Sequence, residues 1–331
     1  MTSKRAIRLA VGISLAALFL WLVFRQVSLN ELASTLHEVN SALMLAALIA
    51  FFLGYSCRIE RWRLMLKHER SNLNWAGCAG PLMASVAANN VLPFRAGDLL
   101  RAFAFNRRLG ITAATSVTSL LVERLLDLLM IVVLLGLALT YFGTGSSQLY
   151  LGVSGAFLIV GAAVISFVLL FPTAFAPMAL ALGRLVALAA PHFGQKLLEQ
   201  IDKCFSALQQ MAQGPTMIRL VFWSALAWLF EGFVFLFAAL ALPAIQSPAA
   251  AWMALPIGTL ATVIPSTPGY VGTFDFFTVR AMTSFGNTTP AATAYALLVH
   301  ALLWLPPTLV GGVYLLLKPI NPQDQFAPRS S

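Results

Sequence analysis

The chain has 331 residues, of which 59% are hydrophobic and only 10% charged, and its mean hydropathy is +0.83. These values exclude an ordinary soluble domain and predict an all-α integral membrane protein, with residues 1–331 forming a single transmembrane domain. The net charge of +9 does not indicate a nucleic-acid partner, because the basic residues collect at the edges of apolar stretches. The three cysteines have neither metal nor disulfide spacing, and no metal or cofactor is predicted.

Six apolar stretches have about the length that crosses a bilayer, roughly 20 residues. They lie at about 7–24, 41–57, 117–142, 150–172, 216–242 and 290–317. Two more, about 73–93 and 249–264, are short or interrupted by proline. The first stretch has the basic start of a signal peptide but is followed by no small-x-small cleavage site, so it is predicted to be a retained span.

Basic residues set the predicted orientation. Three of them precede the first span and acidic residues follow it, which places the N-terminus in the cytoplasm. Basic clusters at 58–70 and 95–108 flank the 73–93 stretch, and both favour the cytoplasm. A stretch with both flanks on one side does not cross, so it is predicted to enter and return as a re-entrant hairpin covered by protein or facing a water-filled cavity.

The later segments complete this topology. Residues 173–214 are predicted to be cytoplasmic, with a helix over 194–213 that lies on the membrane surface or on neighbouring helices. The polar tail 318–331 is predicted to be a disordered cytoplasmic end.

The two interrupted stretches share a motif. "VLPFRAG" (91–97) and "VIPSTPG" (263–269) both read Val-aliphatic-Pro-x-x-x-Gly. Three predicted spans lie between the copies, so the second copy enters from the opposite side. This pattern predicts an inverted repeat, with halves at about 41–142 and 216–317 and with two opposed re-entrant hairpins that form a site near the midplane.

The motif residues favour an anionic ligand. Pro93 and Pro265 end a helix, while Gly97, Gly269 and Gly272 allow a turn or a close approach of backbone to ligand. The free amide groups that begin the next half-helix carry partial positive charge and favour a phosphate.

Charged residues next to the first break have two interpretations. Arg95, Asp98 and Arg101 are three residues apart, so they either extend the site with full charges or form a structural ion-pair ladder. Glu123 and Asp127 share one helical face beside Arg124. In the first interpretation Arg124 binds a lipid phosphate, and the two acids position Arg124 or exchange a proton. In the second, the charged side chains lie at the interface and snorkel.

Two ionisable residues lie within later apolar stretches. An isolated carboxylate at Glu231 is costly in a span and is expected to be protonated or paired. Glu231 and His300 are candidates for proton coupling, and the alternative for each is a structural hydrogen bond.

Three segments, "NNVLPFRAGDLLRAFAFNRRLGI", "SLLVERLLDLLMIVVLL" and "IPSTPGYVGTFDFF", resemble the lysylphosphatidylglycerol synthase transmembrane-region family. These flippase-like proteins are related to the membrane domain of bacterial multiple peptide resistance factors, and the resemblance covers nearly the whole chain. It implies a bacterial inner-membrane protein that moves, or helps to move, a lipid between leaflets. It also implies no aminoacyl transfer, because the soluble transferase half is missing. Tyr270 occupies a position where the family usually has glycine, and Asp98 and Asp275 occupy positions where glutamate is common. These departures imply that the size of the bound headgroup, or the reach of the acidic side chains, differs from that in the family.

The predicted function is therefore transport of an anionic phospholipid or polyprenyl-phosphate headgroup between leaflets, without catalysis. No nucleotide-binding loop occurs in the sequence, so an ion gradient or mass action is expected to supply the energy. One alternative is an intramembrane lipid-modifying transferase that uses Asp98, Glu123 or Asp127 as a metal or base site. Another is a non-transporting scaffold for a separate lipid-modifying enzyme. The predicted substrate-binding residues are Asn90, Pro93, Arg95, Gly97, Asp98, Arg101, Glu123, Arg124, Asp127, Pro265, Thr267, Pro268, Gly269, Gly272 and Asp275.

Overall fold

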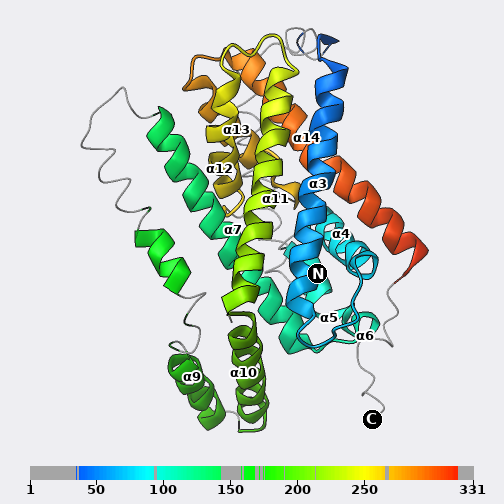
Figure 1. Cartoon of the computed structure of the whole chain (residues 1–331), viewed down its shortest axis with the longest axis vertical. Helices are drawn as coiled ribbons and strands as arrows, with labels where there is room; N and C mark the ends of the chain where they lie inside the picture. The colour runs from blue at the N-terminus through cyan, green and yellow to red at the C-terminus, as the bar shows by residue number, and fades with distance from the viewer. Residues whose placement is uncertain are drawn as a thin grey trace.

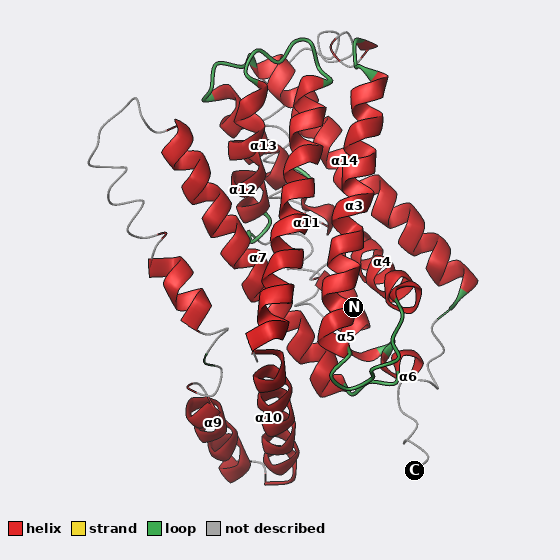
Figure 2. Cartoon of the chain, in the orientation of Figure 1, coloured by secondary structure: helices red, strands yellow, loops and turns green. Residues whose placement is uncertain are grey.

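The computed structural model describes residues 37–92, 95–142, 160–167, 176–189, 191–212, 214–264 and 268–319, together with positions 35, 158, 171 and 174. The described residues form helices and connecting loops, and no strand occurs among them (Figure 2). The all-α prediction is confirmed. The first predicted span, most of the 150–172 stretch, and residues Pro93, Pro265 and Thr267 lie outside the described part.

Four long helices contain predicted spans: α3 (Ser41–Leu66), α7 (Ala113–Phe142), α11 (Gly214–Leu240) and α14 (Thr289–Leu317). Three helices of the described part, at Ser41–Leu66, Pro215–Leu240 and Thr289–Leu317, are long and apolar enough to cross a membrane. The helix that contains the second predicted span extends beyond the apolar stretch, because α3 continues to Leu66. The continuation buries Arg61 and Trp62 completely, so packing holds this basic segment in the helix.

The two interrupted stretches form pairs of shorter helices. α4 (Trp75–Val91) is followed by α5 (Ala96–Phe103), and α12 (Ala251–Ala261) is followed by the 3₁₀ turn η5 (Pro268–Tyr270) and α13 (Thr273–Thr283). Within each pair the helices pack against each other, so the chain turns back at each break. This fold-back is compatible with two hairpins, while their re-entry into a membrane stays a prediction. The short helix α6 (Asn106–Leu109) then leads from α5 to α7.

The same order of elements occurs twice: a long helix, a broken pair and a second long helix. The closing long helix of each half packs on the broken pair of the other half, α14 on α4 and α7 on α12. The two opening helices, α3 and α11, pack side by side (Figure 1). This reciprocal packing is the arrangement expected of an inverted repeat.

Small residues bring the long helices close together. A Cβ at Gly54 of α3 would lie 3.4 Å from the Ala227 carbonyl of α11, and a Cβ at Gly311 of α14 would overlap the Met83 carbonyl of α4. Such close approach through small residues is typical of helix packing in membranes, where apolar burial between helices provides little driving force.

The segment after α7 includes α9 (Ala176–Ala189) and α10 (Pro191–Ala212), which lie at the lower end of Figure 1. The predicted helix over 194–213 is confirmed as α10. Leu208 and Met211 near its C-terminal end are buried in a cluster with residues of α3, α7 and α11. At the end of the chain, Arg108 donates hydrogen bonds to the Lys318 and Pro319 carbonyls at 3.1 and 2.6 Å, so contacts with α6 hold the first two residues of the predicted tail.

Candidate functional site

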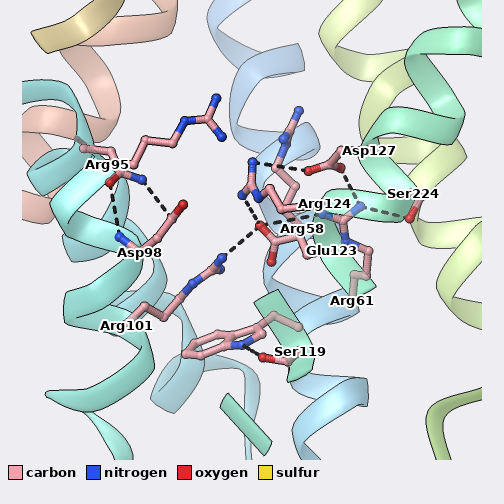
Figure 3. A network of polar contacts seen from close by, with 12 residues as sticks. Arg58, Arg61, Arg95, Asp98, Arg101, Ser119, Glu123, Arg124, Asp127 and Ser224 are labelled. Atoms are coloured by element: carbon pink, nitrogen blue, oxygen red, sulfur yellow. Dashed lines mark hydrogen bonds and ion pairs between the residues drawn. The ribbon is translucent and has the colours of Figure 1, made fainter. Parts of the chain in front are cut away.

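A buried group of charged side chains lies where α3, α5 and α7 meet (Figure 3). We call it the charged cluster, and its members are Arg61, Arg101, Glu123, Arg124 and Asp127. Arg61 and Arg101 are 0% and 2% exposed, and both carboxylates are 7% exposed. Charges removed from water to this degree need partners, so their arrangement limits what the site can bind.

Glu123 is the centre of one half of the charged cluster. Its Oε1 atom accepts hydrogen bonds from Arg101 Nη2 at 3.0 Å and from Arg124 Nη2 at 2.8 Å. The Arg101 guanidinium also lies 5.2 Å from the Trp62 ring centroid, and the Trp62 indole donates to Ser119 at 3.1 Å. Arg101 is therefore fixed between an acid and an aromatic ring.

Asp127 is the centre of the other half. Its Oδ1 atom accepts from Arg61 Nη1 at 2.8 Å and from the Trp228 indole at 3.2 Å. The same Arg61 nitrogen donates to Ser224 at 2.9 Å, which joins α3 and α7 to α11. Arg124 Nη1 lies 3.8 Å from Asp127 Oδ2, so Arg124 lies near both carboxylates. The predicted shared face of the two acids is confirmed.

The charged cluster has an excess of one positive charge, because three guanidinium groups face two carboxylates. Several of its buried polar atoms, Arg61 Nε and Nη2, Arg101 Nε and Glu123 Oε2, have no hydrogen-bond partner among the described residues. The Arg124 side chain is 44% exposed, so Arg124 is the accessible arginine of the charged cluster. A low-dielectric site with one excess positive charge is stabilised by a bound anion.

Arg95 and Tyr270 connect the two chain breaks. Arg95 Nε donates to the Tyr270 hydroxyl at 2.7 Å, and the guanidinium lies 5.7 Å from the ring centroid. Their φ angles are 51° and 61°, and they are the non-glycine residues with positive φ in the described chain. Strained backbone of this kind is often found at functional sites.

The alternative interpretation of Arg95, Asp98 and Arg101, a structural ion-pair ladder along α5, is not observed. Asp98 instead accepts from Asn89 Nδ2 at 2.9 Å, while its backbone amide donates to Asn89 Oδ1 at 3.2 Å. Arg101 turns to Glu123, as described above, and Arg95 turns to Tyr270. Asn89 thus satisfies an amide near the start of α5 that was expected to face a phosphate.

Two other predicted site residues have packing contacts. Asn90 Nδ2 donates to the Trp304 carbonyl at 3.2 Å and to Thr308 Oγ1 at 2.9 Å, which fixes α4 to α14. A Cβ at Gly97 would overlap the Ser85 carbonyl, so this glycine allows α5 to lie close against α4. A ligand role for either residue stays a prediction.

The second break is organised around His300. Its Nδ1 lies 2.8 Å from Asp275 Oδ1, and its Nε2 lies 2.9 Å from the Gly269 carbonyl. The Gly272 amide donates to Asp275 Oδ2 at 2.8 Å, and Asp275 is 1% exposed. The φ angles of Gly269 and Gly272 are 71° and 89°, which confirms that both glycines serve the turn. Of the remaining predicted residues here, Pro268 begins η5.

Glu231 forms an ion pair with Arg58, which confirms the expectation that this carboxylate is protonated or paired. The Arg58 guanidinium also lies 5.7 Å from the Tyr55 ring and 5.5 Å from the Trp228 ring. A cavity of about 110 Å³ between α3, α11 and α14 borders this pair.

Arg58 and Arg61 are the principal residues that the sequence analysis missed, because the basic cluster at 58–70 was used only for topology. A signal for Arg61 was present in the sequence. Arg61 continues the seven-residue spacing of Ala47 and Gly54, which both lie on the buried face of α3. Extending that face beyond residue 57 places Arg61 inside the protein.

Comparison with known proteins agrees with the motifs. The profile of the lysylphosphatidylglycerol synthase transmembrane region family matches residues 7–311. The chain belongs to this family. The matched region contains both broken pairs and the whole charged cluster, so the family resemblance and the prediction of a membrane protein are confirmed.

A curated relative gives further information on the family. The chain is 28% identical to the glycosyltransferase AglD of Haloferax volcanii over 337 residues, covering 93% of this chain and 54% of the relative. The chain thus spans about half of that relative's length. The prediction that the chain is not an enzyme finds no support in this match, because the relative is named as a glycosyltransferase.

Proposed function

We propose that this family member binds a lipid with a phosphate headgroup at Arg124 and Arg95 and moves it between the leaflets of the bacterial inner membrane, with both termini cytoplasmic. The observation that carries this proposal is the excess positive charge of the charged cluster, which is exposed at Arg124. A phosphate oxygen accepts charge-assisted hydrogen bonds from guanidinium groups and would neutralise that excess.

Arg95 and Arg124 are favoured over the other arginines of the site because their side chains are the ones that can reach a ligand. Arg61 and Arg101 are buried and bonded to carboxylates, so they fix the acids rather than reach a ligand. Among the described residues Arg95 is bonded to Tyr270 through Nε, which leaves its two Nη groups for a phosphate. Arg124 is near enough to Tyr270 for electrostatic interaction, and in Figure 3 the Arg95 side chain extends toward the charged cluster.

The architecture supports movement in addition to binding. The Arg95–Tyr270 and Asn90–Trp304 contacts each join the first half of the chain to the second. A site shared by two broken, oppositely inserted helix pairs lets one half rock against the other while the ligand stays bound, as in many secondary transporters. We therefore interpret the two halves as an inverted repeat with re-entrant hairpins.

A second candidate function follows from the relative's name. As a glycosyltransferase relative, the chain would act on a lipid-linked sugar, either as part of the catalytic machinery or as a membrane scaffold for a separate enzyme. Asp98, Glu123 and Asp127 are the carboxylates that would serve as bases. Glu123 and Asp127 accept from guanidinium groups, and Asp98 accepts from Asn89. The described residues contain no group of three His, Cys, Asp or Glu side chains placed to hold a metal ion. Transport is therefore the function that we favour.

The test is a vesicle assay with purified protein and fluorescent lipids that carry a phosphate or a neutral headgroup. Arg124→Ala and Arg95→Ala should each slow movement of the phosphate lipid by about tenfold or more, because a charge-assisted hydrogen bond is lost. Lysine at these positions should restore the rate only in part, because it lacks the planar fork of arginine. Arg280→Ala is the matched control, since this exposed arginine of α13 contacts Phe276. Wild-type rates in the double alanine variant would contradict the proposal, and turnover of a lipid-linked sugar without lipid movement would favour the transferase.

A further inference from the structure

The contacts of His300 require one more proton than neutral histidine and ionised aspartate together provide. The Gly269 carbonyl is only an acceptor, so the Nε2 atom 2.9 Å away must donate. A neutral imidazole with a proton on Nε2 has a lone pair on Nδ1. That lone pair would face Asp275 Oδ1 at 2.8 Å, and an ionised carboxylate is also only an acceptor. A proton must therefore lie between Nδ1 and Oδ1.

Loss of this proton breaks one of the two contacts. If Nε2 keeps its hydrogen, two lone pairs face each other between His300 and Asp275. If the hydrogen moves to Nδ1, two lone pairs face each other between His300 and the Gly269 carbonyl. Asp275 has little freedom to turn away, because it is 1% exposed and its other oxygen accepts from the Gly272 amide at 2.8 Å.

We propose that the His300–Asp275 pair is a proton-binding site, and that the single proton it holds is coupled to the occupancy of the lipid site. This inference rests on the proposed function and identifies the proton as the coupling ion. The physical connection is short. His300 holds Gly269, the next residue is Tyr270, and the Tyr270 hydroxyl holds Arg95 at 2.7 Å.

The coupling has a definite direction. With the proton bound, His300 holds the turn that carries Tyr270, and Arg95 stays in place for the phosphate. With the proton released, His300 loses its contact with either the Gly269 carbonyl or Asp275, whose other oxygen holds the Gly272 amide. Either loss loosens the turn that carries Tyr270, so Arg95 loses a fixed partner. Proton binding and lipid binding therefore favour the same arrangement, and each raises the affinity for the other.

The surroundings of His300 contain few other charges. Asp275 of α13 is the titratable group of the described chain that acts on it directly, and Tyr270 with its partner Arg95 lies on the adjoining turn. From α4, the residue beside this turn is the uncharged Asn90. The Phe274 ring packs edge-on at 5.3 Å. Glu231, the other candidate for proton coupling, already forms an ion pair with Arg58 and needs no proton.

The first arm of the test measures the proton directly, without any transport. The protein is labelled with ¹⁵N-histidine and placed in nanodiscs, and its other three histidines are replaced by glutamine. Nitrogen NMR then reports the protonation of the two ring nitrogens of His300. The ring should titrate, and the titration should move to higher pH when a phosphate lipid is added. Asp275→Asn should abolish this response. A neutral His300 that neither titrates nor responds to lipid would overturn the inference, whatever the transport assay shows.

The second arm uses the vesicle assay with an imposed pH gradient. If one proton accompanies each lipid, a gradient of about one pH unit should change the equilibrium leaflet ratio about tenfold. His300→Gln keeps a donor for Gly269 but has no dissociable proton, so lipid should still move while its distribution ignores the gradient. The exposed His68→Gln is the matched control. Because Asp275 is itself a predicted site residue, Asp275→Asn is compared only by its equilibrium leaflet ratio, not by its rate, and that ratio should also ignore the gradient. If the wild-type protein moves the lipid but the leaflet ratio does not change with the pH gradient, the coupling is wrong and the proposed function stands. No wild-type movement refutes the proposed function, and the NMR arm then decides on the proton site.

Discussion

At the scale of single residues, the contact between Arg95 and Tyr270 joins two strained positions. A left-handed backbone costs a non-glycine residue about 1–2 kcal/mol. Tyr270 occupies a place where the family resemblance leads us to expect glycine, so the side chain is retained despite the strain. The hydroxyl that holds Arg95 at 2.7 Å supplies a functional reason for this cost.

Substitutions at Tyr270 separate backbone strain from this hydrogen bond. Tyr270→Phe keeps the ring and the strain but removes the hydroxyl, so transport of the phosphate lipid should fall several-fold while stability changes little. Tyr270→Gly should relieve the strain and raise the unfolding free energy by about 1 kcal/mol. Because the Tyr270→Gly variant also frees Arg95, it should move the phosphate lipid more slowly and accept a wider range of headgroups. Thermal unfolding and the vesicle assay measure the two effects, and a Phe variant with the wild-type rate would show that the bond has no role.

The charged cluster makes a second prediction at this scale, on stability. Asp127→Ala should destabilise the protein by about 3–5 kcal/mol, because it leaves the buried Arg61 without its carboxylate. Glu199→Ala in α10 is the control, since the Glu199–Lys203 pair is exposed and screened by water, so its loss should change the unfolding free energy little. Denaturant unfolding in detergent compares the two variants. Equal losses would mean that Arg61 finds another partner or water.

At the scale of elements, the contact between α14 and α4 depends on one face of α14. A Cβ at Gly311 would overlap the Met83 carbonyl, whereas a Cβ at Gly312 meets no heavy atom within 4 Å. Gly311→Ala should therefore cost about 1–3 kcal/mol through overpacking. Gly312→Ala should be neutral or slightly stabilising, because alanine has the higher helix propensity. Unfolding measurements compare the Gly311→Ala and Gly312→Ala variants, which have the same substitution at adjacent positions. A similar loss of unfolding free energy in both would contradict the close packing of α14 on α4 at Gly311.

The helices were predictable from the sequence to the extent that local patterns define them. Apolar length predicted the long helices, and proline and glycine predicted both breaks, because each signal lies within a few residues of its effect. The contacts of the site were less accessible. Arg61 meets Asp127 across 66 positions and Arg95 meets Tyr270 across 175, and no local pattern encodes such a pairing. The positive-inside rule also led to the wrong environment for Arg61, because it treats arginines beside a span as topological signals.

At the scale of the whole molecule, the reciprocal packing of the two halves explains why the site has contributions from both. α14 packs on α4 as well as on α13, and α7 packs on α12 as well as on α5, so neither broken pair is enclosed by its own half alone. The two breaks lie side by side, because Arg95 after the first donates to the Tyr270 hydroxyl after the second at 2.7 Å. Beside them, Trp304 of α14 donates to the Asn90 carbonyl of α4 at 3.3 Å. A motion that changes the α3–α11 contact would therefore act on both halves of the site together.

The proposed inverted repeat makes a prediction about topology, and the positions of the loops allow a test. The connection between α3 and α4 and the segment around α6 lie at one end of the molecule, and the loops that follow α11 and α13 lie at the other end (Figure 1). In a chain without native cysteines, we would introduce single cysteines at Asn72, Arg107, Gln246 and Ser284, which are all exposed. Arg107 is a better reporter than Asn106, because Arg107 is exposed and Asn106 is half-buried.

Impermeant maleimide should label positions 72 and 107 from the cytoplasm, because basic clusters lie near both. Positions 246 and 284 should label only from the opposite side. If residues 150–172 cross as predicted, three long helices lie between the two broken pairs along the chain, and an odd number of crossings places the second pair on the other side of the membrane. Labelling of 72 and 107 from opposite faces would show that α4 and α5 cross the membrane instead of returning. In that case the two halves would not be inverted copies, and the argument for rocking around a shared site would fail, although the charged cluster would remain a site for an anion.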